Sequence, residues 1–201
     1  METIEKLNGI NALSIKEQLA ICEILDNSFE QKFAILKIKT PKEGKDIWLK
    51  DLLTFKKGLL YRKDGDILGV AILASKENPC FCSLTKLIKR LGLIKGILAK
   101  LWFTLEAVKS DKTLKLEFVA VKPTARGLGV GKKLLNRLFE LTAEEGFEEL
   151  ALEVVDTNPR AKKLYQNLGF KTVKSVNTKF FTKRMGFEVS DTMIKTVTKY
   201  K

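Results

Sequence analysis

Residues 114–132 constrain the fold of this chain more than any other part of the sequence. They begin with an apolar run typical of a β-strand, pass through a turn that contains Gly127, Gly129 and Gly131, and then open a helix. Such a turn exposes backbone N–H groups, and the helix adds partial positive charge at its N-terminus. The sequence therefore predicts a strand–turn–helix unit that binds an anionic phosphate.

The spacing of this turn excludes two well-known phosphate motifs. A Walker loop would need glycine where Arg126 stands and serine or threonine where Lys133 stands. A dinucleotide fingerprint that starts at Gly127 would need a further glycine where Lys132 stands. Neither a P-loop nor a dinucleotide-binding unit is therefore predicted.

Helices and strands alternate along the rest of the chain. A helix is predicted over 14–33, with Ser14 as its N-cap and Glu17 three residues later. Asp64-Gly65 between two apolar runs predicts a β-hairpin. The other predicted elements are helices over 47–55, 130–146 and 158–168 and strands over 59–62, 67–74, 114–121, 150–155, 171–176 and 190–197.

Strict alternation predicts which side chains share a face of the strand over 114–121. The expected faces are Leu114, Leu116, Phe118 and Ala120 on one side and Lys115, Glu117, Val119 and Val121 on the other. Glu117 is thus expected to share a face with two valines.

Residues 83–107 form a basic amphipathic segment that Gly92 and Gly96 are expected to break into two helices. Such a face covers a sheet more often than it lies on a membrane, and both interpretations are open at this point. The longest apolar stretch, 91–105, is interrupted by Lys95 and Lys100 and is shorter than the ~20 residues of a spanning helix.

No histidine occurs among the 201 residues. This excludes Ser-His-Asp and Cys-His catalysis and removes the commonest zinc ligand, and no metal site is predicted. Any general base must therefore be a carboxylate, a neutral lysine, a tyrosine, a cysteine or a relayed water.

The formal net charge is +13, from 37 basic and 24 acidic residues. Such a charge suits nucleic acid, anionic lipid or a phosphate-rich cofactor. Only 6 of the 37 basic residues are arginine, however, and proteins that read bases rely on arginine. We therefore interpret most of the lysines as a solvated surface and expect neither nucleic-acid nor membrane partners.

The cysteine count is odd, with Cys22, Cys80 and Cys82. A secreted domain of this size would normally pair its cysteines, so a reducing compartment is favoured. The N-terminus also lacks the basic and apolar regions of a signal peptide. We therefore expect a cytoplasmic protein.

Two linked motifs resemble those of the GNAT N-acetyltransferase superfamily. Arg126, Gly129 and Gly131 occupy the defining positions of its acyl-CoA-binding motif, Q/R-x-x-G-x-G/A. The residues that match the second family motif are Asn158, Ala161, Leu164-Tyr165 and Leu168-Gly169-Phe170. The resemblance is close over 114–198, whereas residues 1–110 agree with the family only in the order of their elements.

The resemblance implies an α+β three-layer fold, in which helices flank a mixed, twisted sheet. The strands over 114–121 and 150–155 would splay apart at its centre. One GNAT domain would span 1–201, with the acceptor side and helical cover in 1–110 and the acetyl-CoA-binding core in 114–198.

The resemblance also implies that acetyl-CoA binds between these two strands. Backbone amides from Arg126 through Lys132 would hold the pyrophosphate, and main-chain groups of Val119 and Val121 would hold the pantetheine arm and the thioester carbonyl. The implied cofactor-binding residues are Val119, Val121, Arg126, Gly127, Leu128, Gly129, Val130, Gly131, Lys132 and Asn158.

Tyr165 and Glu117 are the catalytic residues that the resemblance implies. Tyr165 would protonate the departing thiolate, although its helical face also suits a core aromatic with a polar tip. Glu117 would be the general base if its carboxylate points toward the acceptor. The alternative for Glu117 is a surface or ion-paired carboxylate, with ordered water as the base.

The predicted function is direct transfer of an acetyl group from acetyl-CoA to a primary amine. One alternative is a non-catalytic acyl-CoA sensor on the same fold. Another is a basic adaptor that binds nucleic acid or a membrane through 83–107. The acceptor amine, the acyl chain and a homodimer are left open.

Overall fold

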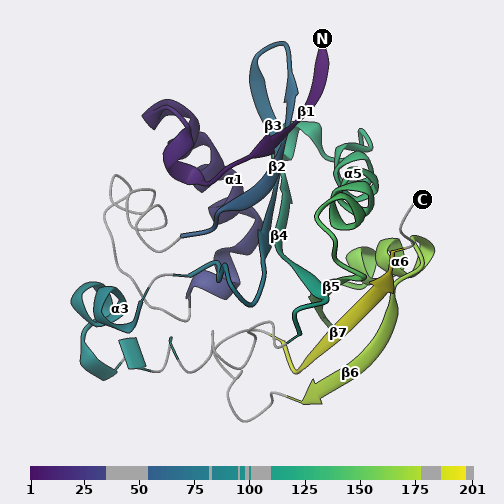
Figure 1. Cartoon of the computed structure of the whole chain (residues 1–201). Coiled ribbons are helices and arrows are strands. Elements are labelled where there is room, and N and C mark those ends of the chain that lie inside the picture. Colours follow the sequence, from purple (N-terminus) through teal and green to yellow (C-terminus); the bar gives the residue numbers. More distant parts are fainter. Residues whose placement is uncertain are drawn as a thin grey trace.

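Seven strands form one mixed sheet in a computed structural model of the chain (Figure 1). The structure describes residues 1–34, 54–81, 83–94, 96–97, 100, 110–177 and 187–197. The strands are β1 (Glu2–Leu7), β2 (Lys57–Lys63), β3 (Asp66–Ala74), β4 (Thr113–Val121), β5 (Glu149–Val155), β6 (Lys171–Asn177) and β7 (Val189–Thr196). Their order is β1-β2-β3-β4-β5-β7-β6, and all neighbours are antiparallel except β4 and β5.

Helices lie on both faces of this sheet, and each face has its own hydrophobic core (Figure 1). The helical elements are η1 (Ile10–Ala12), α1 (Ile15–Ala34), α3 (Leu84–Leu91), η2 (Pro123–Ala125), α5 (Val130–Glu144) and α6 (Pro159–Asn167). One core joins Leu25 of α1 to the sheet, and the other joins Leu138 of α5 and Tyr165 of α6 to it. The predicted mixed sheet flanked by helices is confirmed.

Local signals placed the first helix and the hairpin correctly. The Ser14 hydroxyl donates to Glu17 Oε2 at 2.6 Å, and the Ser14 backbone N–H donates to the same oxygen at 2.9 Å. This reciprocal cap starts α1 where the sequence predicted it. Asp64 and Gly65 both have positive φ, at 51° and 86°, which gives the β2–β3 turn the twist that a two-residue hairpin needs.

A β-bulge in β4 corrects the predicted alternation of its side chains. Consecutive residues of β3 pair with Leu116 and Phe118, so Glu117 is an extra residue on the β4 side. Leu116 therefore lies with Leu114 in the core under α5, whereas Phe118 lies with Ala120 in the core under α1. The prediction that these four share one face is wrong, because an inserted residue shifts a period of two.

The two central strands separate halfway along their length. β4 and β5 pair from Thr113↔Glu149 to Leu116↔Leu152, although β4 continues to Val121 and β5 to Val155. Main-chain groups of β4 beyond Leu116 that face β5 therefore have no partner strand on that side among the described residues. The predicted splay of these strands is confirmed.

Part of the predicted amphipathic segment 83–107 is described as α3. This helix ends at Leu91, and Gly92 follows with φ 81°, as predicted for a helix stop. Gly96 makes no break of the same kind, because its N–H donates to Gly92 O at 2.9 Å and its α-carbon packs on Ile88. Residues 101–109 and most of the predicted helix 47–55 lie outside the described residues. No helix within the described ranges is long and apolar enough to cross a bilayer.

Candidate active site

The glycine turn ends in an uncapped helix N-terminus. Gly129 is the N-cap of α5, with φ 79°, and neither a side-chain cap nor an acidic residue occupies the first turn. The first three N–H groups of a helix have no acceptor within it, and the bond from Lys133 N to Gly129 O is the first that α5 makes. A Cβ at Gly127 or Gly129 would meet no atom within 4 Å. The turn thus presents N–H groups beside open space, as an anion requires.

The Arg126 side chain holds this turn in place. Its Nε donates to Val121 O at 3.3 Å, and its Nη2 donates to Ser28 Oγ at 3.3 Å. Arg126 therefore links the turn both to the end of β4 and to α1. Its guanidinium also places positive charge beside the turn, which would attract a phosphate.

The start of α5 lies tightly on the sheet. A Cβ at Gly69 of β3 would sit 2.8 Å from Val130 Cγ1 and 3.0 Å from Leu134 Cδ1. Glycine at this position lets the first turn of α5 approach the sheet closely. No pattern in the sequence predicts this contact, because it joins residues about sixty positions apart.

Asn158 caps α6 and keeps part of its side chain available. Its Oδ1 accepts a hydrogen bond from Ala161 N at 3.1 Å, and Pro159 occupies the first helical position of the helix predicted over 158–168. The amide NH₂ of Asn158 is not used by the cap. It is the group with which Asn158 can donate a hydrogen bond to a ligand.

A partly buried ion pair anchors α6 to β7. Lys162 Nζ lies 2.5 Å from Asp191 Oδ2, and the Ser175 hydroxyl of β6 donates to Asp191 Oδ1. The hydrogen bonds from Lys162 and Ser175 lower the pKa of Asp191. The cluster fixes α6, and with it Asn158 and Tyr165, against the sheet.

The Tyr165 side chain is buried on the α5–α6 side of the sheet. Its ring contacts that of Phe170, with 5.8 Å between centroids. Burial raises the pKa of Tyr165 to about 12. The phenol therefore keeps its proton through neutral and moderately alkaline pH, as a proton donor must.

Glu117 belongs to a buried cluster of charged side chains on β4 and β5. Lys115 Nζ lies 3.1 Å from Glu117 Oε1 and 3.4 Å from Glu153 Oε1. The side chains of Lys115 and Glu117 are 7% and 6% exposed. Glu117 Oε2 is buried and has no hydrogen-bond partner among the described residues. Such an oxygen is an unused acceptor, available to a donor that enters the site.

A family model described as the acetyltransferase (GNAT) family matches residues 20–170, which include the glycine turn, the separated strands and α6. The chain belongs to the GNAT family. GNAT relatives include a thialysine N-epsilon-acetyltransferase of Sus scrofa, 30% identical over 97 residues that make up 46% of this chain and 57% of that protein.

A second relative is a ribosomal protein bS18-alanine N-acetyltransferase of Haemophilus influenzae, 37% identical over 68 residues. That match covers 34% of this chain and 45% of the relative. The chain thus spans about half the length of the curated relatives it matches.

Solved structures support the GNAT fold over the whole chain. One described as an acetyltransferase has a TM-score of 0.64 at 21% identity, and the match covers 98% of this chain and 100% of that one. The ribosomal-protein-S18-alanine N-acetyltransferase of Escherichia coli has a TM-score of 0.59 at 18% identity, and the match covers 100% and 97%. At these identities the likeness shows the fold.

The glycine turn follows β4 and α6 follows β5, and these two strands pair only as far as Leu116↔Leu152. The separation of β4 and β5 beyond that pair is called the opening below. Tyr165 lies in the core on the α5–α6 side of the sheet. Glu117 meets Lys115, whose side chain lies on the opposite face from its neighbours Leu114 and Leu116. The two predicted catalytic side chains therefore approach the sheet from opposite faces.

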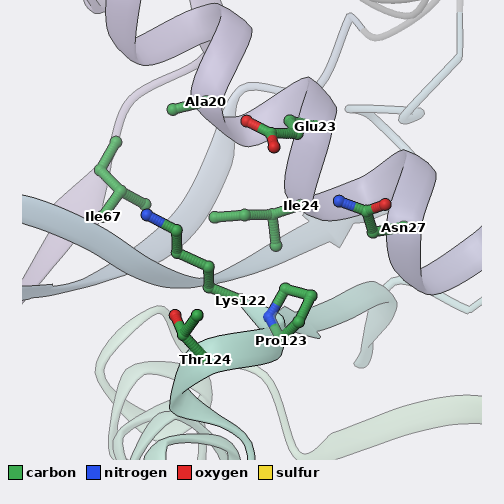
Figure 2. Close-up of a pocket in the computed structure, with 8 residues that line it drawn as sticks. All are labelled: Ala20, Glu23, Ile24, Asn27, Ile67, Lys122, Pro123 and Thr124. Atoms are coloured by element: carbon green, nitrogen blue, oxygen red, sulfur yellow. The ribbon is translucent and has the colours of Figure 1, made fainter.

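A small pocket lies apart from this opening, between α1 and the segment after β4 (Figure 2). Its volume is ≈ 190 Å³. Glu23 and Asn27 of α1 face Lys122 and Thr124 across it, with Ile24 between them. None of the predicted GNAT site residues lines this pocket.

Three residues of the candidate site had not been singled out from the sequence. They are Lys115, Glu153 and Asp191. Each is an ordinary charged residue in an alternating strand, and its importance comes from partners on a neighbouring element. Among the described residues, no group of three or more His, Cys, Asp or Glu side chains is placed to hold a metal ion.

Proposed function

We propose that this chain is an acetyl-CoA-dependent N-acetyltransferase, which moves the acetyl group directly to a primary amine in a ternary complex. The observation that carries the proposal is the separation of β4 and β5 beyond Leu116↔Leu152. The Tyr165 phenol is buried on the α5–α6 face of the sheet, and Glu117, the first β4 residue after that pair, has a buried oxygen with no hydrogen-bond partner among the described residues. Direct transfer needs a proton donor and a proton acceptor.

The residues around the opening fit acetyl-CoA. The uncapped N-terminus of α5 and the glycine turn, 127–132, suit its pyrophosphate, and Arg126 adds positive charge beside them. Val119, Val121 and the Asn158 amide border the path of the pantetheine arm. When bound, acetyl-CoA supplies the acetyl group as a thioester.

The side chains account for the protons of the transfer. Glu117 Oε2 takes one proton from the acceptor ammonium, which makes its nitrogen a nucleophile. The nitrogen–carbon bond then forms and the carbon–sulfur bond breaks, while a backbone N–H of β4 stabilises the negative charge on the carbonyl oxygen. Tyr165 gives its proton to the departing sulfur and regains one from the new amide nitrogen. Glu117 returns its proton to water, so each turnover releases one proton.

The cysteines agree with the expected cytoplasmic setting. Cys22 and Cys80 are buried thiols, which suits a reducing compartment such as the cytoplasm. A homodimer stays a prediction. The acceptors named for the two relatives, thialysine and the alanine of a ribosomal protein, both offer an amine and are the first probes to use.

The proposal is tested by a panel of amines incubated with acetyl-CoA. The panel contains thialysine, lysine, an alanine-ended peptide, spermidine and an aminoglycoside, and the measurements are CoA release and the mass of the acetylated product. We expect stoichiometric CoA and acetylated amine for at least one class. Tight acetyl-CoA binding without any acetylated amine would instead identify a sensor. Salt-dependent retention on DNA or anionic vesicles without acetyl-CoA binding would identify a basic adaptor.

A further inference from the structure

The buried charged cluster lies at the point where β4 and β5 separate. Leu116↔Leu152 is the last pair of the parallel ladder, and Glu117 and Glu153 are the next residues on the two strands. Glu153 points toward the α1 face, since its neighbour Leu152 lies in the core under α5. Lys115 lies on that same face and reaches both carboxylates.

One ammonium group serves two carboxylates in this cluster. Lys115 Nζ contacts Oε1 of Glu117 at 3.1 Å and Oε1 of Glu153 at 3.4 Å. Glu117 Oε2 is buried and has no hydrogen-bond partner in the part of the chain that the structure describes. An unused buried acceptor destabilises a fold. A ligand that brings an N–H donor would satisfy it.

We propose that Lys115 is a positioning residue for acyl transfer, which holds Glu117 by Oε1 so that Oε2 faces the ammonium group of a cationic acceptor. This inference rests on the proposed function, because it takes Glu117 as the base. A charge-assisted hydrogen bond to one oxygen fixes the plane of a carboxylate and the direction of its second oxygen. Without Lys115, the Glu117 side chain can rotate away from the acceptor.

A double variant separates positioning from charge balance. Lys115→Met alone removes the cation that contacts the buried Glu117 carboxylate and can unfold the chain. Lys115→Met combined with Glu153→Gln leaves the net charge of the protein unchanged and removes the hold on Glu117. The matched control is Lys112→Met, the same substitution in an exposed ion pair with Glu148 just before β4.

The expected result is a fall in kcat of about 30-fold in the double variant, measured with the panel amine that the wild type acetylates fastest. The KM for acetyl-CoA stays within about 2-fold, and Lys112→Met stays within about 2-fold in both constants. A double variant with kcat within about 3-fold of the wild type would overturn the inference, because charge balance alone would then suffice.

Crystal structures of the wild type and the double variant give a readout that is independent of turnover. We expect one Glu117 conformer in the wild type and more than one in the double variant. The same single conformer in both proteins would overturn the role of Lys115, whatever the acceptor. If the wild type acetylates no amine while Glu117 responds as expected, the proposed function fails and the positioning contact stands.

Discussion

The glycine turn before α5 and the charged cluster on β4 and β5 differ in the groups that they offer to a ligand. The turn offers backbone N–H groups and open space, and residues with φ near 80° shape it. The cluster consists of three charged side chains from two strands, of which Lys115 and Glu117 are buried, and one Glu117 oxygen has no hydrogen-bond partner among the described residues. The turn depends on space that no side chain fills, whereas the cluster depends on the contacts between its side chains.

This difference predicts that cofactor affinity and turnover are separable. A bulky or negative side chain in the turn blocks an anion whatever happens in the cluster. A change in the cluster or at Tyr165 alters proton transfer and leaves the phosphate site intact. The four variants below test that separation, from the largest expected effect to the smallest.

Gly129→Glu is expected to weaken acetyl-CoA binding by about 1000-fold, or about 4 kcal/mol. It places a carboxylate at the N-terminus of α5, where the phosphate would lie, and adds the strain of a left-handed φ. Gly146→Glu is the matched control, because Gly146 follows the other end of α5 with φ 83° and equally open space. Calorimetric titration measures both; equal loss in the two variants would refute the phosphate site.

Tyr165→Phe is expected to lower kcat by about 100-fold and to change the Kd for acetyl-CoA by less than about 2-fold. The substitution removes the proton donor and keeps the ring against Phe170. Tyr61→Phe makes the same change at another buried tyrosine of the same core and should leave kcat within about 2-fold. Steady-state kinetics decide the matter: an unchanged kcat in Tyr165→Phe would assign Tyr165 to the core alone.

Glu117→Gln is expected to lower kcat/KM by about 30-fold at neutral pH. The deficit should shrink as the pH rises toward the pKa of the acceptor amine, about 10, because the amine then loses its proton without help. A pH series of kcat/KM for both proteins measures this. A deficit that stays constant up to pH 10 would show that Glu117 has a role other than the base.

Asp191→Asn is expected to destabilise the fold by about 2 kcal/mol and to weaken acetyl-CoA binding only a few-fold, because it loosens α6 without touching the turn. The pKa of Asp191 is lowered in the folded protein. Its contribution is therefore present above about pH 4 and is lost as the pH falls below that value. Denaturant unfolding at pH 7 and pH 3 should show a smaller difference between wild type and variant at pH 3.

The parts of the molecule that the sequence predicted well are those that depend on near neighbours in the chain. The Ser14–Glu17 cap, the Asp64-Gly65 hairpin and the Asn158-Pro159 helix start each involve residues within three positions. The glycine turn belongs to the same group. Such features form wherever the same few residues occur, so they can be predicted without knowing which other segment of the chain packs against them.

The charged cluster could not be predicted in this way. The bulge at Glu117 depends on how β3 pairs with β4, and it moved Phe118 to the face opposite Leu116. The contact between Lys115 and Glu153 joins two strands, with a whole helix between them in the chain. A lone residue in a strand carries no signal of such a partner, because register is set by tertiary pairing.

The central claim is that the thioester of acetyl-CoA lies in the opening between β4 and β5, between Tyr165 and Glu117. A crystal structure of the chain with bound acetyl-CoA tests it most directly. The account predicts the thioester sulfur within about 3.5 Å of the Tyr165 hydroxyl and the acetyl carbon facing Glu117 Oε2. A sulfur more than about 6 Å from that hydroxyl, or an arm that passes outside the opening, would contradict it.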